Sequence, residues 1–218
     1  MKPSGQRPLL IFDLDGTLID SRLDLTHAVN AMLRHMQRAT LAEETVSSYV
    51  GNGAPVLVRK VLGAEASDAE AAAGLAFFLQ YYEDHKLDYT VLYPGVRKAL
   101  TAFQARGAVL SVLTNKPVKI SEAIVDGLGL GGMFLRVYGG NSFEFKKPHP
   151  IGIERLMAEA ACSAAETIMV GDTYVDVRTA RNAGVRACGV SYGFQPESLV
   201  DDPPDMLVDD LGELSAYL

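Results

Sequence analysis

The stretch LLIFDLDGT, residues 9–17, decides how this chain folds and where its chemistry lies. Its four leading apolar residues are typical of a buried strand, and that strand ends in two carboxylates. Side chains two residues apart on extended backbone point the same way, so Asp13 and Asp15 face one point. Carboxylates this close repel each other unless a cation or a shared proton relieves them. The stretch therefore predicts a metal site, a proton-transfer pair, or both.

The composition limits the class of protein. The 218 residues, 48% hydrophobic and 22% charged, suit a globular chain with one large domain or a core with a sizeable insertion. The net charge of −7 argues against a nucleic-acid partner or a membrane partner. Cys162 and Cys188 are too few for a disulfide framework, and only four apolar residues follow residues 1–7, too few for a signal peptide. We therefore expect a cytoplasmic protein.

Short apolar runs alternate with segments of helical period along most of the chain. This alternation predicts an α/β fold, a doubly wound and mostly parallel Rossmann-like sheet with helices on both faces. Strands are expected at residues 9–12, 108–113, 135–138, 167–170, 185–190 and 206–208, and helices at residues 96–105, 118–128, 151–161, 175–183 and 211–217.

The alternation stops between about Ser21 and Asp88, where no strand-like run occurs and helical periodicity takes over. We therefore expect an all-helical cap domain, residues 21–88, inserted into an α/β core domain, residues 1–20 and 89–218. An insertion after the first strand lies above the carboxyl ends of the sheet, where open α/β folds bind ligands. The cap is thus placed to act as a lid.

Three of the expected strands end in a polar residue: Asp13, Thr114 and Asp172. Lys146 and Lys147 follow a fourth strand, and Pro148 suits the first turn of the next helix. Any one of these residues alone can be a helix cap, a turn or a solvated charge. Because the carboxyl ends of parallel strands share one edge, their joint placement favours a single functional site there.

The segments DLDGTL (13–18), LTN (113–115), KP (147–148) and GDTYVD (171–176) resemble, in order, the four motifs of the haloacid dehalogenase superfamily. The helical insertion is similar to the cap of that family. Within the superfamily, residues 13–33, 49–62, 112–117 and 138–148 most resemble phosphoglycolate phosphatases.

The resemblance implies that Asp13 is a nucleophile, attacking phosphorus to give an aspartyl phosphate that water then hydrolyses. An ionised carboxylate can do this without a base. Asp15 would protonate the leaving group and then deprotonate the water. The implied cofactor is Mg²⁺, held by the side chains of Asp13 and Asp172 and the backbone carbonyl of Asp15, a ligand set that suits this hard cation.

The resemblance also implies how the phosphoryl group is held. Thr114 and the backbone N–H of Asn115 would bind its oxygens. Lys147, rather than Lys146, would neutralise charge on the nucleophile and the phosphoryl group. Asp176 would orient Lys147 or a metal-bound water.

Substrate choice is expected in the cap. Gly51, Asn52 and Gly53 form a turn that leads into a helix, whose N-terminus could receive a carboxylate, although the turn could equally be a mere connection. Arg59 or Lys60, one turn further on, is a candidate cation for the glycolate carboxylate, but helical spacing alone predicts that both are solvated.

The predicted activity is hydrolysis of a small phosphorylated metabolite, with 2-phosphoglycolate, giving glycolate and phosphate, the best guess. The alternatives are pyrophosphate, a nucleotide or a sugar phosphate as substrate, a phosphomutase, or a non-catalytic signalling module phosphorylated on aspartate. Asp15 argues against dehalogenases, which lack this residue, and Leu25 stands where β-phosphoglucomutases have a histidine. Whether the chain is a monomer or a homodimer stays open.

Overall fold

The structure is a computed structural model, and it describes residues 7–217. Residues 1–6 and residue 218 lie outside this part. The first six include most of the segment that was predicted not to be a signal peptide, and both ends of the predicted core domain are affected. None of the helices within residues 7–217 has the length and apolar character needed to cross a membrane.

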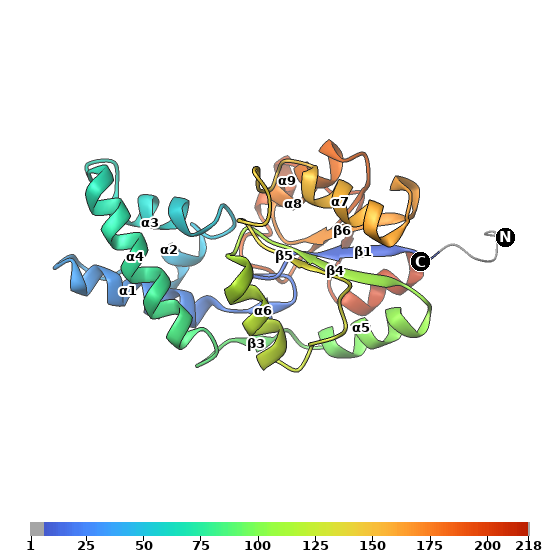
Figure 1. Cartoon of the computed structure of the whole chain (residues 1–218), viewed down its shortest axis with the longest axis horizontal. Coiled ribbons are helices and arrows are strands. Elements are labelled where there is room, and N and C mark those ends of the chain that lie inside the picture. The colour runs from blue at the N-terminus through green and yellow to red at the C-terminus, as the bar shows by residue number, and fades with distance from the viewer. Residues whose placement is uncertain (1–6, 218) are drawn as a thin grey trace.

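A six-stranded sheet forms the centre of the larger part of the molecule (Figure 1). Its strand order is β5-β4-β1-β6-β7-β8, and every neighbouring pair is parallel. This arrangement confirms the predicted α/β fold class. The strands are β1 (Leu9–Phe12), β4 (Val109–Leu113), β5 (Val137–Tyr138), β6 (Thr167–Gly171), β7 (Arg186–Val190) and β8 (Met206–Val208).

Alternate residues of the central strand β1 pack on opposite faces of the sheet, as period-two side chains must. Leu9 and Ile11 belong to one buried cluster, and Leu10 and Phe12 to another. The first cluster is covered by α7 (Ile151–Ala160) and α8 (Tyr174–Asn182). The second is covered by α5 (Val96–Ala105), α6 (Val118–Gly127) and the 3₁₀ segment η2 (Leu211–Tyr217).

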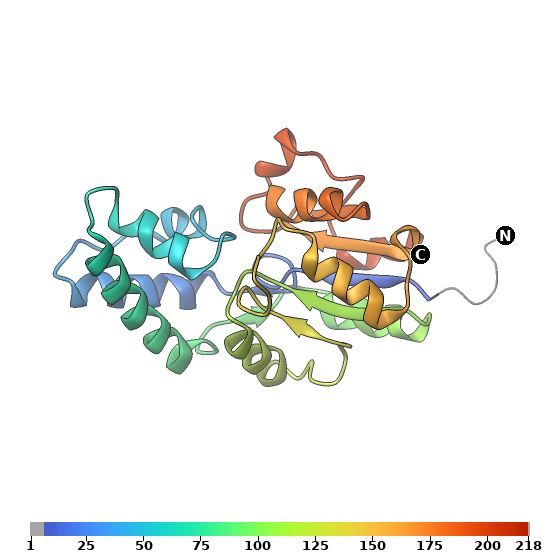
Figure 2. The same ribbon diagram turned by 45° about the horizontal axis from the view of Figure 1, so that its top comes forward.

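Four further helices gather at one end of the molecule, on the left in Figures 1 and 2. They pack against one another, and all lie in the stretch of the chain without strand-like runs. They are α1 (Arg22–His35), α2 (Glu43–Ser47), α3 (Ala54–Leu62) and α4 (Asp68–His85).

Two short strands join these helices to the sheet. β2 (Ile19–Asp20) pairs antiparallel with β3 (Val91–Leu92), so the two connecting segments run side by side. The buried Asp24 of α1 strengthens this junction, because its carboxylate accepts hydrogen bonds from the backbone N–H groups of Tyr89 and Thr90 and from the Thr90 hydroxyl. Two residues are too few to show an alternating pattern, so these strands were not predicted; β5, equally short, was predicted only as part of the longer run at residues 135–138.

Smaller differences from the sequence analysis occur at the ends of elements. Pro148 was expected in the first turn of a helix, but α7 begins at Ile151, and Pro148 lies before it in a cis peptide bond with Lys147. The short helix α9 (Ser198–Asp201) and the 3₁₀ turn η1 (Ala164–Glu166) were not anticipated. These segments are too short for hydrophobic periodicity to mark them.

Candidate active site

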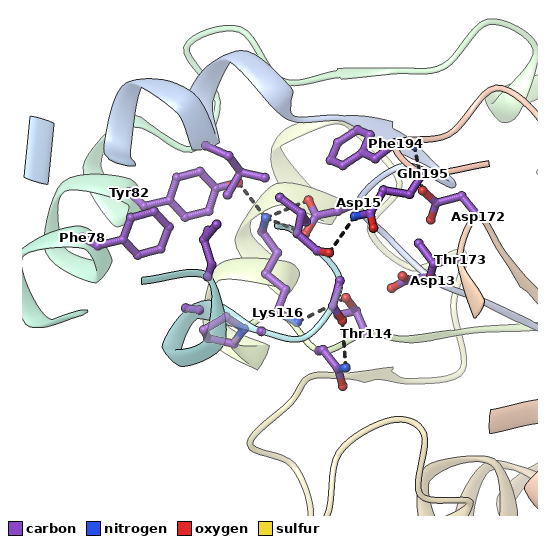
Figure 3. Close-up of a pocket in the computed structure, with 18 of the residues that line it drawn as sticks. Asp13, Asp15, Phe78, Tyr82, Thr114, Lys116, Asp172, Thr173, Phe194 and Gln195 are labelled. Carbon is purple, nitrogen blue, oxygen red and sulfur yellow. Dashed lines mark hydrogen bonds and ion pairs between the residues drawn. The ribbon is translucent and has the colours of Figure 1, made fainter. Parts of the chain in front are cut away.

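The ends of three neighbouring strands meet at one pocket, and the helical part of the chain closes its opposite side, at the left of Figure 3. Phe12 pairs with Val112 of β4 and Val170 of β6, so these three strands end at nearly the same level. Asp13, Thr114 and Asp172 therefore line the same space. The opposite wall is largely apolar and comes from α1, α3 and α4, through Leu25, Leu57, Phe78, Leu79 and Tyr82.

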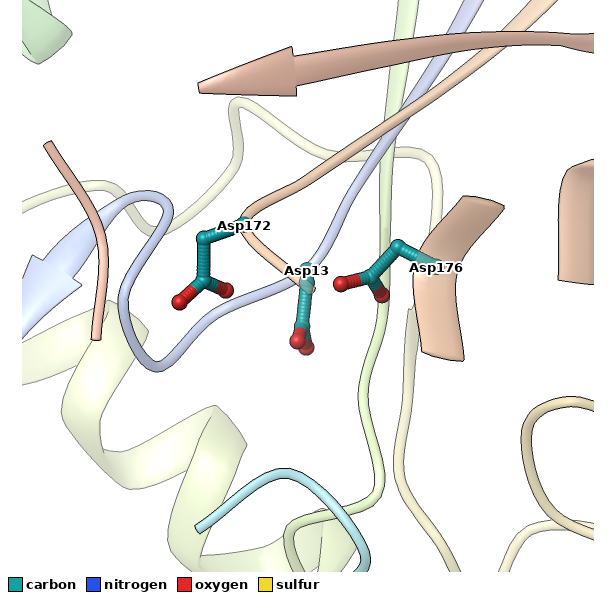
Figure 4. Close-up of side chains that lie close together, drawn as sticks. All are labelled: Asp13, Asp172 and Asp176. Carbon is teal, nitrogen blue, oxygen red and sulfur yellow. The ribbon is translucent and has the colours of Figure 1, made fainter. Parts of the chain in front are cut away.

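Asp13, Asp172 and Asp176 form a buried carboxylate cluster (Figure 4). Each offers one ligand atom, and these atoms lie within 4.8 Å of one another. Burial raises the pKa of Asp13 to about 6, against the opposing charge of Lys147. Burial, together with the charges of Asp176 and Asp13, also raises the pKa of Asp172 well above its ordinary value. The cluster thus holds more negative charge than one neighbouring lysine can offset, and its hard oxygen donors fit a divalent cation such as Mg²⁺.

Lys147 is the cation that the cluster does contain. Its Nζ lies 2.9 Å from Oδ1 of Asp13 and 2.7 Å from Oδ1 of Asp176, and its side chain is only 1% exposed. Burial alone would lower the pKa of Lys147, but the two carboxylates together raise it, so the ammonium stays charged. The choice of Lys147 over Lys146 agrees with this geometry.

The carboxylate oxygens of Asp13 and Asp176 differ in the number of hydrogen-bond and ion-pair partners that they have. Oδ1 of Asp13 accepts from the Leu14 N–H at 2.7 Å and pairs with Lys147, while Oδ2 has no hydrogen-bond donor within residues 7–217. In Asp176, Oδ1 pairs with Lys147, and Oδ2 accepts from the N–H and hydroxyl of Thr173, which caps α8. Asp13 therefore keeps an oxygen for chemistry, whereas Asp176 uses both to hold its neighbours.

Asp172 sits in a cradle of backbone and small residues. Its Oδ2 accepts from the Phe194 N–H at 2.8 Å, and its Oδ1 lies 3.3 Å from the Thr17 hydroxyl. Gly16, with φ of +80°, comes so close that a Cβ there would lie 2.2 Å from Asp172 Oδ2. Only glycine suits both this backbone conformation and this approach, so the Asp-Gly turn of the opening motif also positions the acid after β6.

Asp15 points away from the carboxylate cluster, toward the helical part of the chain (Figure 3). Its Oδ1 accepts from the Ser21 hydroxyl at 2.5 Å. Nζ of Lys116 lies 2.8 Å from Oδ1 and 3.0 Å from Oδ2. Lys116 was not predicted as a site residue, because a lysine just after a strand is usually solvated and no local pattern marks this one as buried.

Thr114 and Asn115 lie in the pocket wall, as predicted. The amide of Asn115 has a further role, since its Nδ2 donates to the backbone oxygens of Gly51 at 2.9 Å and Lys147 at 3.1 Å. It thereby joins the loop before α3 to the loop that carries the buried lysine. Its Oδ1 is buried and has no partner in the described part of the chain.

The loop before α3 lies against the sheet. Gly51 and Gly53 line the pocket, whereas Asn52 contacts the Tyr174 hydroxyl at 3.4 Å and its backbone oxygen accepts from Lys146 Nζ at 2.5 Å. Thr173, Phe194 and Gln195, which the sequence analysis also missed, complete the wall. Phe194 and Gln195 follow the predicted strand β7, so their place after a strand end was the one available signal.

Arg59 and Lys60 are not brought to the pocket. Arg59 donates to the backbone oxygen of Ala66 and pairs with Asp68 at 2.5 Å, which holds it on the outer side of α3. Nζ of Lys60 lies over the ring of Tyr49, 5.4 Å from its centroid. The suggestion that Arg59 faces the substrate is therefore not supported, because its guanidinium is engaged between α3 and α4.

A buried aspartate with one free oxygen beside a lysine, at the carboxyl edge of a parallel sheet, suits an enzyme of the α/β class that reacts through a carboxylate. Comparison of the sequence with known protein families gives the same class. The family model of haloacid dehalogenase-like hydrolases matches residues 10–190, and the chain belongs to this family. The resemblance drawn from the four sequence motifs is thus confirmed.

Similar proteins cover nearly the whole chain. A phosphoglycolate phosphatase of Pseudomonas syringae pv. tomato is 39% identical over 97% of this chain and 80% of its own length. One from Colwellia psychrerythraea is 33% identical over 96% of both chains. The crystal structure of a protein described as a predicted phosphoglycolate phosphatase, from Haemophilus somnus 129PT, is 30% identical, covers 98% of this chain and 99% of its own, and superposes with a TM-score of 0.91.

Proposed function

We propose that this hydrolase is a Mg²⁺-dependent phosphatase for small phosphate monoesters, with 2-phosphoglycolate as its preferred substrate and glycolate and phosphate as products. The observation that carries the reaction class is Asp13, which keeps Oδ2 free while Lys147 holds Oδ1. The names of the relatives, at 33–39% identity, support the substrate.

In the first step, Oδ2 of Asp13 attacks phosphorus, the bond from phosphorus to the ester oxygen breaks, and an aspartyl phosphate forms. Asp15 gives its proton to the departing ester oxygen. To do so it must exchange at least one of its present partners, Ser21 or Lys116, for that oxygen.

In the second step, a water molecule attacks the phosphorus of the aspartyl phosphate, and Asp15 takes the proton of that water. The bond between phosphorus and Asp13 breaks, which restores the carboxylate and releases phosphate. Throughout, the Thr114 hydroxyl and the Asn115 N–H hold the phosphoryl oxygens, and Lys147 offsets their charge.

We assign the metal to the side chains of Asp13 and Asp172 and the backbone carbonyl of Asp15. Asp176 is assigned to hold Lys147, because one of its oxygens pairs with that lysine and the other accepts from Thr173, whereas Asp172 forms no ion pair within residues 7–217. When bound, Mg²⁺ supplies positive charge to the phosphoryl group and the nucleophile.

Residues 21–88 are proposed to act as a cap domain that moves on the β2–β3 junction. Its contacts with the core near the pocket include the hydrogen bonds of Asn115 to Gly51 and of Gln195 to the backbone oxygens of Ser47 and Val50. Opening the cap breaks these bonds and admits substrate.

The substrate assignment is tested by comparing kcat/KM for 2-phosphoglycolate, pyrophosphate, nucleotides and sugar phosphates. We expect 2-phosphoglycolate to exceed the others by about tenfold or more, which corresponds to about 1.4 kcal/mol of transition-state binding. A tenfold advantage for any other substrate would contradict this assignment and leave the reaction class standing.

Mg²⁺ is expected to stabilise the fold, because it offsets the excess negative charge of three buried carboxylates that have only Lys147 as a cationic partner. At 100 times its Kd it should add about 2.7 kcal/mol, which raises Tm by roughly 5–10 °C for a chain of this size. Thermal unfolding with and without Mg²⁺ measures this shift.

The matched variants for that experiment are Asp172→Asn and Asp84→Asn. Asp172→Asn should lose most of the Mg²⁺-induced shift, while its metal-free form is at least as stable as the parent, because a buried repelling carboxylate is gone. Asp84 is exposed on α4, and its variant should keep the full shift. A full shift in Asp172→Asn would remove Asp172 from the metal site.

A further inference from the structure

Lys116 is the single cationic side chain among the described residues that line the pocket. It follows Asn115, directly after the end of β4, and its side chain is only 4% exposed. Its Nζ reaches both oxygens of Asp15 and lies 2.6 Å from the hydroxyl of Tyr82 on α4 (Figure 3). Lys116 thus stands between the proposed proton donor and the wall of the cap.

The side chain of Lys116 stays positively charged. Burial alone would lower its pKa, but Asp15 and Tyr82 together raise it. Burial raises the pKa of Tyr82 to about 12, so its hydroxyl stays neutral and keeps a proton. The pocket therefore presents one ammonium, flanked by the side chain of Asp15 and the neutral hydroxyl of Tyr82.

The surroundings of Lys116 restrict what it can bind. The cap wall beside it is largely apolar, through Leu57, Phe78 and Leu79, and the other charged residues that line the pocket are aspartates. An anionic group on the departing part of a substrate would find no other positively charged partner among the residues of this lining. An unpaired charge there would be costly, because the wall beside it is largely apolar.

We propose that Lys116 is the specificity-determining residue that binds a carboxylate on the leaving group of the substrate. This inference rests on the proposed function, and it names the residue that selects the substrate at that site. In 2-phosphoglycolate the carboxylate carbon is two bonds from the ester oxygen that Asp15 protonates. Lys116, already within hydrogen-bond distance of Asp15, is therefore within reach of both groups.

Binding of that carboxylate also changes the partners of Asp15. The carboxylate competes with Asp15 for Nζ, and Asp15 is left with the Ser21 hydroxyl and an oxygen free to face the ester oxygen. A substrate without an anionic leaving group does not compete in this way. Lys116 thus favours carboxylate-bearing substrates by direct pairing and by freeing Asp15.

The test compares Lys116→Met with the parent enzyme on 2-phosphoglycolate and on ethyl phosphate, which has two carbons but no carboxylate. We expect kcat/KM for 2-phosphoglycolate to fall by about 100-fold, mainly through KM, since a buried charge pair with the substrate is lost. For ethyl phosphate the loss should be at least about tenfold smaller, because there only the contact of Lys116 with Asp15 is removed. Lys116→Arg should recover part of the loss, and Lys119→Met, which alters an exposed lysine of α6, should change neither substrate.

Equal losses on both substrates would overturn the inference, because they would mean that Lys116 acts only on Asp15 or on the fold. If thermal melting shows that Lys116→Met does not fold, the same comparison with Lys116→Gln decides the question. A parent enzyme that hydrolyses ethyl phosphate but not 2-phosphoglycolate would overturn the proposed substrate, and this inference with it. The activity of the parent enzyme therefore tests the proposed substrate, and the activity of the Lys116 variant tests the role of Lys116, so that the two failures can be distinguished.

Discussion

Asp13→Asn is expected to lower kcat by roughly 10⁴-fold or more for every phosphate monoester, because an amide oxygen cannot form the aspartyl phosphate. That loss corresponds to about 5.4 kcal/mol in the barrier. The change removes one buried negative charge beside Asp172 and Asp176, so the fold should survive it. Steady-state hydrolysis of an aryl phosphate, whose leaving group needs little help from Asp15, isolates the role of the nucleophile.

Two controls make that measurement decisive. Intact mass must show that the new asparagine has not deamidated, and Asp84→Asn, on the exposed face of α4, should keep full activity. Rapid quenching of the parent enzyme should trap one phosphoryl group per chain, which Asp13→Asn should not acquire. Retention of more than a few per cent of turnover in Asp13→Asn would show that another residue is the nucleophile.

Lys147→Met is expected to damage both stability and catalysis. It leaves the carboxylates of Asp13 and Asp176 buried without their common cation, at a cost of about 3–5 kcal/mol in the free energy of unfolding. Loss of its charge near the phosphoryl group should lower kcat by roughly 10²- to 10³-fold. Denaturant unfolding without metal measures the first effect, and hydrolysis at saturating Mg²⁺ measures the second.

Lys146→Met is the matched control, since it changes the neighbouring residue of the same type. Lys146 donates to the backbone oxygen of Asn52 and is more exposed, so its loss should leave the free energy of unfolding within about 1 kcal/mol of the parent. We expect at most a few-fold change in KM, because this bond only helps to hold the loop before α3. Equal effects of the two substitutions would contradict the assignment of Lys147.

The sheet could be predicted almost completely from the sequence because its signals are local. An apolar run of four to six residues marks each of the longer strands, and the parallel order makes their carboxyl ends share one edge. Asp13, Thr114 and Asp172 were therefore correctly expected at one edge of the sheet, although no interatomic distance was known. The junction of β2 and β3 could not be predicted in this way, because its strands are only two residues long.

The roles of individual charged side chains were harder to predict from the sequence. Lys146 and Lys147 are adjacent in the sequence, and the resemblance to a known family favoured Lys147. In the structure Lys147 is buried between Asp13 and Asp176, while Lys146 reaches the loop before α3. Arg59 shows the opposite outcome, since a cation suggested for the substrate is paired with Asp68.

The amino-acid sequence by itself determined the α/β fold, the family and the carboxylates that end β1 and β6, because hydrophobic period and motif spacing are properties of short stretches. Only the tertiary structure decided that Asp15 turns toward Lys116 and that Lys116 meets Tyr82 of α4. Tyr82 lies 34 residues before Lys116, and Asp15 lies 101 residues before it. Whether such a lysine is solvated or buried depends on which distant segments pack over it, and no local pattern records that.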